Sequence, residues 1–381
     1  MNYKKAQEPD SKTNKNICLI IDTLIGGGAE RVVLTLADTL QKLGHHVNVM
    51  IFHNRIHYSL DRINFKIHII EREHPVRFLR RYKRAKDVQE KISELGIKVD
   101  LTVSNSLGVH KVCKQAKLPN LYFCIHNTTS VSEFNRYKNR KGWNKFRGRI
   151  SRYFRSTWIK KLYKKQNLIA VSNGVKDDAL KFGIRPKSIR TIYNPFDFND
   201  IRQQAKSYRP DEKDYIVHVG SFSKQKRHDI LIKAYHQSGI DEQLLLLGDN
   251  ENADGERMKQ LAADLNLQNK VIFKGFNKHP YPYIKNAKAL VLSSDFEGLP
   301  TVLIEALILG VPVVSTDCPS GPSEILVDDM SEFLSPVGDV GALAINIRKI
   351  IKTPVKATEA NIESFCATTV AKQYLALCKD D

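Results

Sequence analysis

The chain has 381 residues, of which 27% are charged and 42% are hydrophobic, and it carries a net charge of +19. This length predicts two domains at roughly 100–200 residues each, and the composition excludes the disordered and fibrous classes. A membrane-spanning helix is not expected, because Glu305, Gly310 and Pro312 interrupt the longest apolar stretch, which runs from Thr301 to Val314.

The first residues and the cysteines indicate a cytosolic protein. Residues 1–15 form a polar tail that lacks the apolar core of a secretory signal peptide. The six cysteines have no CxxC spacing, and Cys18, Cys124 and Cys318 lie in or beside apolar runs. We interpret them as reduced core thiols, so neither a disulfide scaffold nor a zinc ribbon is expected.

Charge is distributed unevenly between the two halves of the chain. Residues 1–195 hold 39 Lys and Arg against 15 Asp and Glu, a net charge of +24. Residues 196–381 hold 21 against 26, a net charge of −5. A basic half of this kind predicts a polyanionic partner. Nucleic acid, a phospholipid surface and a phosphorylated acceptor all meet that description.

Strands and helices alternate along the first half of the chain. A strand over residues 16–22 leads into the glycine cluster Gly26–Gly28, and a helix over residues 29–43 follows. Further strands are predicted at residues 47–52, 99–104, 121–125 and 168–171. Such alternation predicts a parallel sheet with helices on both faces.

A turn at Ile192–Phe196, which contains an Asn-Pro pair, precedes a second alternating region. Helical patterns at 229–236 and 255–265 lie among five predicted strands, at residues 215–219, 243–247, 271–273, 289–292 and 311–315. We therefore predict two doubly wound α/β domains, 16–195 and 196–360, and a helical segment, 361–381, that packs back on the first domain. Ligands of such sheets bind at the carboxyl ends of the strands, here facing a cleft between the domains.

The clearest candidate site is Glu297–Glu305. Pro300 suits the first position of a helix, and the start of a helix offers free N–H groups and a positive dipole end to a phosphate. Glu297 precedes this helix and Glu305 lies a little over one turn into it, so the two carboxylates are placed for sugar hydroxyls, Glu305 for a ribose and Glu297 for a hexose. The alternative is that both are solvated glutamates at a helix end.

Three other segments follow predicted strands. Gly26–Gly28 would let the backbone approach a phosphate, although a tight strand–helix turn needs glycine too, and the spacing is not the GxGxxG of dinucleotide sites. His126 is placed to bond a sugar hydroxyl or a phosphate, or else is a structural histidine at a strand end. In Gly220–Arg227, a lysine would neutralise a diphosphate leaving group, and the alternative is a basic surface turn.

The basic residues of the first half form two clusters. Residues 136–165 contain 13 Lys and Arg and no acidic residue, interleaved with aromatic side chains. The second cluster, between Arg77 and Lys86, lies on a predicted helix. Basic residues among aromatics are typical of a nucleic-acid groove or of a helix on a membrane surface, whereas a charge run can also be a solvated face.

Together these residues resemble the family-4 retaining glycosyltransferases, which have two Rossmann-like domains (the GT-B fold). The resemblance covers roughly residues 16–375. Its motifs are Gly26–Arg31, His126, Ile192–Pro195, Val219–Lys226, Leu247–Asp249, Val271–Gly275, Glu297–Glu305 as an E-x7-E motif, and Ser320–Leu326.

The resemblance implies a role for each of these residues. Glu305 would bind the ribose of the sugar donor, Glu297 the transferred sugar and Lys226 the diphosphate, while His126 would face the sugar near the reacting carbon. His126, Glu297 and Lys226 are thus the implied catalytic residues. Gly275 and Phe276 would lie near the nucleobase, and Leu299 and Pro300 would offer their backbone N–H groups to the phosphates. The remaining implied contacts of the sugar donor are Gly27, Gly28, Ser221, Gly298 and Thr301.

One departure concerns the diphosphate. The family commonly has an arginine directly after the glycine at 220, where this chain has Ser221. Lys226 then lacks its usual cationic companion unless Lys224 or Arg227 replaces it. The sequence contains no DxD motif, so the resemblance implies no metal and no cofactor. It also implies attack from the front face, with the leaving phosphate accepting the acceptor's proton.

The expected function is therefore transfer of a hexose or N-acetylhexosamine from a nucleotide sugar, with UDP as the nucleotide, to a bacterial lipid-linked or lipopolysaccharide acceptor. The expected location is the inner face of the cytoplasmic membrane, bound peripherally and without nucleic acid. The acceptor or membrane contacts are Arg77, Arg80, Arg81, Arg84, Arg147, Arg149, Arg152, Arg155 and Trp158. The alternatives are a GT-B epimerase or phosphorylase, a nucleic-acid-binding protein and a non-catalytic membrane scaffold.

Overall fold

The structure, a computed structural model, describes residues 14–25, 28–56, 64–70, 80–130 and 143–378, with the side chains of 143–150 excepted. The chain divides into two compact units, residues 1–123 together with 371–381, and residues 124–370. The domain boundaries expected at 195/196 and 360/361 stay predictions.

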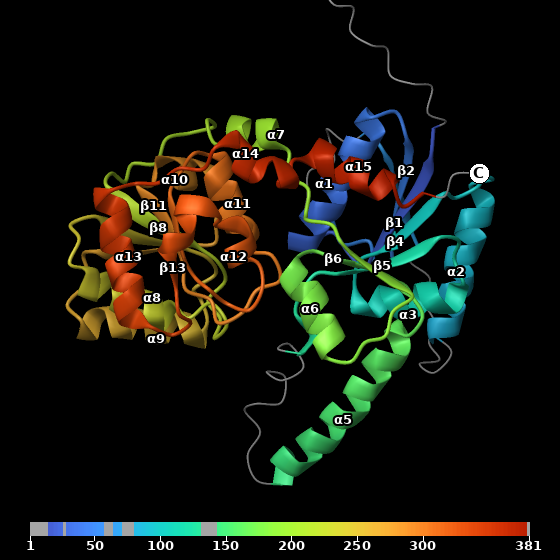
Figure 1. The fold of residues 1–381 in the computed structure, drawn as a ribbon, viewed down its shortest axis with the longest axis horizontal. Helices are drawn as coiled ribbons and strands as arrows, with labels where there is room; N and C mark the ends of the chain where they lie inside the picture. The colour runs from blue at the N-terminus through green and yellow to red at the C-terminus, as the bar shows by residue number, and fades with distance from the viewer. Residues whose placement is uncertain (1–13, 26–27, 57–63, 71–79, 131–142, 379–381) are drawn as a thin grey trace, which may run out of the picture. The chain divides into compact units, whose positions relative to one another are not determined.

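The first sheet has seven strands in the order β3-β2-β1-β4-β5-β6-β7 (Figure 1). The pairs β1–β2, β1–β4, β2–β3, β4–β5 and β6–β7 are parallel. The strands are β1 (Asn16–Ile21), β2 (His46–Ile51), β3 (Lys66–Ile69), β4 (Leu101–Ser104), β5 (Leu121–Ile125), β6 (Asn167–Ala170) and β7 (Ser188–Thr191). The helices along this part of the chain are α1 (Gly28–Lys42), α2 (Arg80–Glu94), α3 (Leu107–Ala116), α5 (Trp143–Tyr163) and α6 (Asn173–Lys181).

The second sheet has six parallel strands in the order β10-β9-β8-β11-β12-β13. The strands are β8 (Tyr215–Val219), β9 (Gln243–Leu247), β10 (Val271–Gly275), β11 (Ala289–Leu292), β12 (Val313–Thr316) and β13 (Leu334–Ser335). The helices are α7 (Phe198–Gln204), α8 (His228–Ser238), α9 (Ala253–Asp264), α10 (Tyr281–Asn286), α11 (Thr301–Ile308), α12 (Pro322–Ile325), α13 (Val340–Lys352) and α14 (Glu359–Ile362).

The predicted α/β class with two doubly wound parallel sheets is confirmed. The central strands are apolar along almost their whole length because helices cover both faces of a parallel sheet, and every residue of β4, β11 and β12 is buried. Three strands escaped prediction: β3, β7 and β13. All three lie at the edge of a sheet and bury few side chains, so their sequences carry little of the apolar signal.

Among the boundaries that differ from those predicted, two have a clear physical cause. β12 begins at Val313 rather than at residue 311, because Pro312 has no N–H for the ladder and contributes only its carbonyl, which accepts from the Leu290 N–H at 2.9 Å. The helical segment predicted at 361–381 is broken before α15 (Ala367–Leu375), since Cys366 is extended. The Phe196 N–H and C=O bond the backbone on either side of that break. Beyond it, residues 371–381 belong to the same unit as residues 1–123, where Asn120 Nδ2 donates to Leu377 O.

A pair of buried histidines lies where β8 leads into α8. The rings of His218 and His228 meet edge to face with centroids 4.6 Å apart, and Phe222 stacks on His228 at 4.1 Å. His218 Nδ1 donates to Val291 O at 2.8 Å, while the Nε2 atoms of both rings are buried without a hydrogen-bond partner. Burial is the main reason that the pKa of His218 falls to about 4 and that of His228 to about 2.

This pair predicts that the protein loses stability in mild acid. Both histidines are neutral in the fold and in the unfolded chain above pH 6.5, so they add nothing there; between pH 6.5 and 4 only the unfolded chain takes up protons. Each histidine then lowers the free energy of unfolding by up to about 1.4 kcal/mol per pH unit. Denaturant midpoints measured between pH 7.5 and 4.5 should fall less steeply for His228→Phe than for wild type. The same substitution at exposed His236 on α8 is the control; equal slopes in all three proteins would contradict the prediction.

Candidate functional site

The strand order of the second sheet reverses between β8 and β11. The chain winds from β8 outward through β9 and β10, then returns to β11 and winds the other way. The loops that leave the carboxyl ends of these neighbouring strands, residues 220–227 and 293–300, therefore meet at one edge. Ligands of open α/β sheets bind at such a switch point.

Lys226 and Glu297 form an ion pair at this switch point. Lys226 Nζ donates to Glu297 Oε1 at 2.7 Å, although the two residues are 71 positions apart in the sequence. Ser294 Oγ donates to the same oxygen, also at 2.7 Å, and Thr316 Oγ1 holds the Ser294 carbonyl at 2.7 Å. Glu297 is only 8% exposed. A cation and a carboxylate thus lie together in a mostly buried setting, each on its own loop.

Glycines bring the backbones at this edge close together. A Cβ on Gly248, the residue that follows β9, would lie 2.0 Å from the carbonyl oxygen of Gly220. The Gly220 N–H donates to Leu247 O, and the Gly248 N–H to Gly275 O, both at 2.9 Å. A larger residue at 248 would displace the start of the loop that carries Lys226, so this glycine is required by close approach.

The helix α11 begins beside Glu297. It starts at Thr301, so Pro300 is the residue before the helix. The prediction that Pro300 is the first residue of the helix is therefore wrong. Proline has no backbone N–H, and Pro300 therefore cannot donate to a phosphate. No side chain caps α11, which leaves its first N–H groups facing that edge. Glu305 is 4% exposed, and Tyr281 OH donates to its Oε1 at 3.3 Å.

Arg227, one of the two candidates for a second cation beside Lys226, is already bonded to carboxylates. Its Nε and Nη2 donate to Asp229 at 2.9 and 3.0 Å, and its Nη1 donates to Asp295 Oδ1 at 2.9 Å. These bonds raise the pKa of Arg227 above its ordinary value. Lys224 and Ser221 are both exposed on the same loop.

The expected nucleobase residues end β10. Gly275 has a φ of +73°, in the left-handed region that favours glycine, and Phe276 beside it is 71% exposed. Such an aromatic ring presents a face to solvent on which a flat ring could stack.

His126 follows β5, as predicted, and its loop is firmly held. Burial lowers the pKa of His126 to about 4, so its imidazole is neutral at pH 7. Asp178 on α6 accepts from the N–H groups of Thr129 and Ser130 at 2.6 and 3.0 Å, just beyond the histidine. A Cβ on Gly298 would lie 2.2 Å from the carbonyl oxygen of His126, so this glycine too is required by close approach.

The carbonyl of Gly298 is held by two serines. Ser172 Oγ donates to it at 2.8 Å and Ser320 Oγ at 2.7 Å. Glu324 accepts from the N–H groups of Asn173 and Gly174 at the start of α6, at 2.6 and 2.9 Å. The two serine bonds hold the Glu297–Pro300 loop at Gly298, and the Glu324 bonds hold the start of α6.

Two of the predicted site residues, Gly27 and Arg77, lie outside the described residues, and Gly28 is the first residue of α1. The side chains of Arg147 and Arg149 are likewise outside the description. On α2, Arg80 and Arg81 are exposed.

Arg84 packs against the end of β2. Its guanidinium lies 5.6 Å from the Phe52 ring centroid, and its Nη2 lies 3.1 Å from His53 Nε2.

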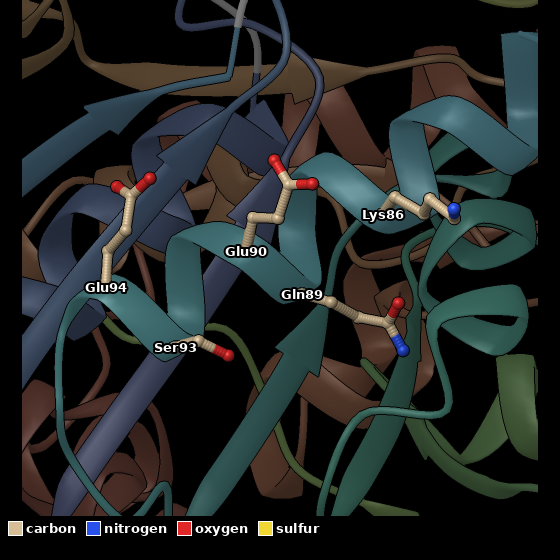
Figure 2. Close-up of a pocket in the computed structure, with 5 residues that line it drawn as sticks. All are labelled: Lys86, Gln89, Glu90, Ser93 and Glu94. Atoms are coloured by element: carbon tan, nitrogen blue, oxygen red, sulfur yellow. The ribbon is translucent and has the colours of Figure 1, made fainter.

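A hollow farther along α2 is lined by Lys86, Gln89, Glu90, Ser93 and Glu94 (Figure 2). Figure 2 shows that all five side chains come from this one helix, and Gln89 Nε2 donates to Ala116 O on α3. The hollow contains none of the predicted site residues.

Exposed aromatic and basic side chains are neighbours on α5. Tyr153 and Phe154 are 68% and 66% exposed, Arg152 is exposed, and Arg155 and Trp158 are half-buried. Among the described residues, no helix combines the length and the apolar character needed to cross a bilayer.

Sequence reasoning missed several residues of the switch-point edge: Gln225, Ser293, Ser294, Asp295 and Tyr281. Gln225 lies within the candidate segment Gly220–Arg227, and Ser293, Ser294 and Asp295 directly follow β11, so their position was the available signal. Tyr281 carried no such signal, because it reaches Glu305 from α10, elsewhere in the fold. In the part of the chain that is described, His, Cys, Asp and Glu nowhere form a group of three or more able to hold a metal ion.

Two family models match consecutive parts of the chain. Residues 26–200 match the family described as Glycosyltransferase Family 4, and residues 199–364 match Glycosyl transferases group 1.

Similar proteins and structures are glycosyltransferases as well. The chain is 28% identical, over 88% of its length and 89% of the relative's, to N-acetylgalactosamine-N,N'-diacetylbacillosaminyl-diphospho-undecaprenol 4-alpha-N-acetylgalactosaminyltransferase of Campylobacter jejuni. It is 31% identical to the lipopolysaccharide 1,6-galactosyltransferase of Escherichia coli, over 48% of its own length and 52% of the relative's. Its fold matches a crystal structure of a glycosyltransferase from Rickettsia africae with a TM-score of 0.74 and 18% identity, over 97% of this chain and 100% of that one.

Proposed function

Because the chain belongs to the glycosyltransferases of family 4 and group 1, we propose that it transfers a sugar from a UDP-sugar. The transferred sugar is a hexose or N-acetylhexosamine, and the acceptor is lipid-linked or a lipopolysaccharide. The relatives support the class of acceptor, since one carries undecaprenol in its name and the other lipopolysaccharide. The nucleotide, the retention of anomeric configuration and the absence of a metal are parts of the proposal.

The observation that carries the proposal is the Lys226–Glu297 pair beside the uncapped start of α11. A diphosphate needs positive charge, and the lysine and the first N–H groups of α11 supply it at one place. A sugar needs acceptors for its hydroxyl groups, and the carboxylates of Glu297 and Glu305 supply those.

The arrangement suggests how bond cleavage is assisted. Charge develops on the diphosphate as the glycosidic bond breaks, and Lys226 is the cation best placed to stabilise it. Glu297 is occupied by Lys226 and Ser294, and we assign it to sugar binding rather than to nucleophilic attack. His126 is neutral at pH 7 and can exchange hydrogen bonds with a sugar without repelling a cationic transition state. The acceptor's proton passes to the leaving phosphate.

The first prediction from this proposal concerns Glu305. Replacing it with Ala removes a buried acceptor for the ribose and should cost about 1.5–3 kcal/mol, the range for hydrogen bonds to charged groups. That corresponds to roughly a 10- to 150-fold loss in kcat/KM for the UDP-sugar. Steady-state kinetics with a panel of UDP-sugars and membrane extracts, together with UDP titration calorimetry, measure it. Glu256→Ala, at an exposed carboxylate on α9, is the control. Unchanged kinetics in a folded Glu305→Ala protein would refute the assignment.

A second prediction concerns metal ions. Because Lys226 and α11 supply the positive charge, transfer should continue at its normal rate in excess EDTA. Initial rates with and without the chelator, after dialysis against it, test this. Loss of activity that Mg²⁺ or Mn²⁺ restores would show that a metal carries the diphosphate.

A third prediction concerns the basic first half of the chain, which we propose binds an anionic membrane surface peripherally, at the inner face of the cytoplasmic membrane. Each Lys or Arg near an anionic bilayer contributes about 1 kcal/mol, so a third of the 13 cations in residues 136–165 would give roughly 4 kcal/mol. The exposed rings of Tyr153 and Phe154 add apolar insertion. The protein should co-sediment with anionic vesicles, bind neutral ones weakly and be released by salt.

Two variants sharpen the vesicle experiment. The first variant, in which Gln replaces Arg147, Arg149, Arg152 and Arg155, should bind vesicles more weakly. The control variant, in which Gln replaces four cations of α9 and α13 (Arg257, Lys259, Lys349 and Lys352), should bind as wild type does. If the first variant binds as wild type does, or if RNA competes the protein off the vesicles completely, the basic half has another partner.

A further inference from the structure

Arg227 bridges two carboxylates that belong to different elements. Its guanidinium uses a two-pronged contact to Asp229, at the start of α8, and a third N–H for Asp295, in the loop after β11. A planar guanidinium suits this geometry because its donors form a rigid fork. The residue before Arg227 is Lys226, and the residue two after Asp295 is Glu297.

The backbone around Arg227 is held in an uncommon conformation. Arg227 has a φ of +49° and a ψ of +48°, in the left-handed region that non-glycine residues seldom adopt. Ser293 Oγ donates to the carbonyls of Lys226 and Arg227, at 2.7 and 3.1 Å. Backbone strain of this kind persists only where neighbouring contacts maintain it, and it gathers at functional sites.

The two loops are also joined on the other side of Lys226. The Asp295 N–H donates to Gln225 O at 2.8 Å, and Gln225 Nε2 donates to Phe296 O at 2.7 Å. Lys226 is therefore flanked by two residues, Gln225 and Arg227, that both bind the loop leading to Glu297.

Charge argues against a direct role for Arg227 on a phosphate. Its cation is matched by Asp229 and Asp295, and Lys226 is matched by Glu297. Turning Arg227 toward a diphosphate would leave two carboxylates without their cation, close to an anionic ligand.

We propose that Arg227 and Asp295 form a positioning pair that sets the register of the two loops and thereby places Lys226 against Glu297, and that Arg227 does not contact the diphosphate. This inference rests on the proposed function for its consequence in catalysis. The pair acts through Lys226, so its loss lowers affinity for the diphosphate although neither member touches it.

The two possible roles of Arg227 predict opposite effects for Asp295→Asn. If the pair positions Lys226, Asp295→Asn and Arg227→Gln each weaken UDP binding and donor kcat/KM about tenfold, and the double variant is no worse than either single one, as expected for residues that act as a unit. If Arg227 contacts the phosphates, Asp295→Asn frees a cation and leaves UDP binding unchanged or tighter, while Arg227→Gln alone weakens it. The second pattern, or losses that multiply in the double variant, overturns the proposal.

Asp229→Asn is the matched control. It removes the same charge from the same guanidinium but leaves the bridge to Asp295, so UDP affinity should stay within about threefold of wild type. A loss equal to that of Asp295→Asn would mean that local charge, not loop register, matters, and would overturn the proposal. Asp295→Glu, which keeps a carboxylate, should recover part of the loss.

A readout without ligand separates this inference from the proposed function. Mass spectrometry after brief acetylation of the folded protein reports the reactivity of each lysine amine. Lys226 should be protected in wild type and in Asp229→Asn, and should be labelled faster in Arg227→Gln and Asp295→Asn at temperatures well below their melting points. If wild type fails to bind UDP but this labelling pattern holds, the proposed function fails and the positioning pair stands. Equal labelling of Lys226 in all four proteins overturns the positioning pair.

Discussion

The reversal of strand order between β8 and β11 is the constraint on which the candidate site depends. It leaves two neighbouring strands whose following loops are 71 residues apart in sequence and joined in space by the Lys226–Glu297 bond. No other pair of adjacent strands in that sheet sends its loops apart in this way, which is why open parallel sheets bind ligands at this point. Close glycine contacts, above all Gly248 against Gly220, let the loops approach.

Positive charge at this edge is balanced before any ligand arrives. Lys226 faces Glu297, and Arg227 faces Asp229 and Asp295. Side chains held by such bonds need little rearrangement when charge develops on a substrate, which is the physical basis of electrostatic preorganisation. The two cations differ in the number of carboxylates that a ligand would have to displace. Lys226 has a single carboxylate partner among the bonds described above, whereas Arg227 has two. A diphosphate can compete for the first far more easily than for the second.

The two halves of the chain divide the chemistry between them. Most of the proposed sugar-donor residues come from a part of the chain with a net charge of −5, where Lys226 and Arg227 are each placed by specific bonds. The first half carries +24, and its basic residues lie on helices such as α2 and α5 with many exposed side chains. A single cation held in position by hydrogen bonds is suited to recognising one small anion. Many exposed cations are suited to an extended anionic surface.

The sequence by itself determined the fold class and the segments that matter. The alternation of apolar runs with helical patterns, and the motif from Glu297 to Glu305, are local signals and were readable without coordinates. Only the tertiary structure decided that Arg227 is committed to Asp295, that Tyr281 reaches Glu305 and that Pro300 precedes α11. The first two are contacts between separate elements, set by the order of strands and the packing of helices, which no local pattern encodes. The positions of helix boundaries and edge strands were hard to predict for a different reason. These segments bury few residues, so the apolar pattern that marks them in the sequence is weak.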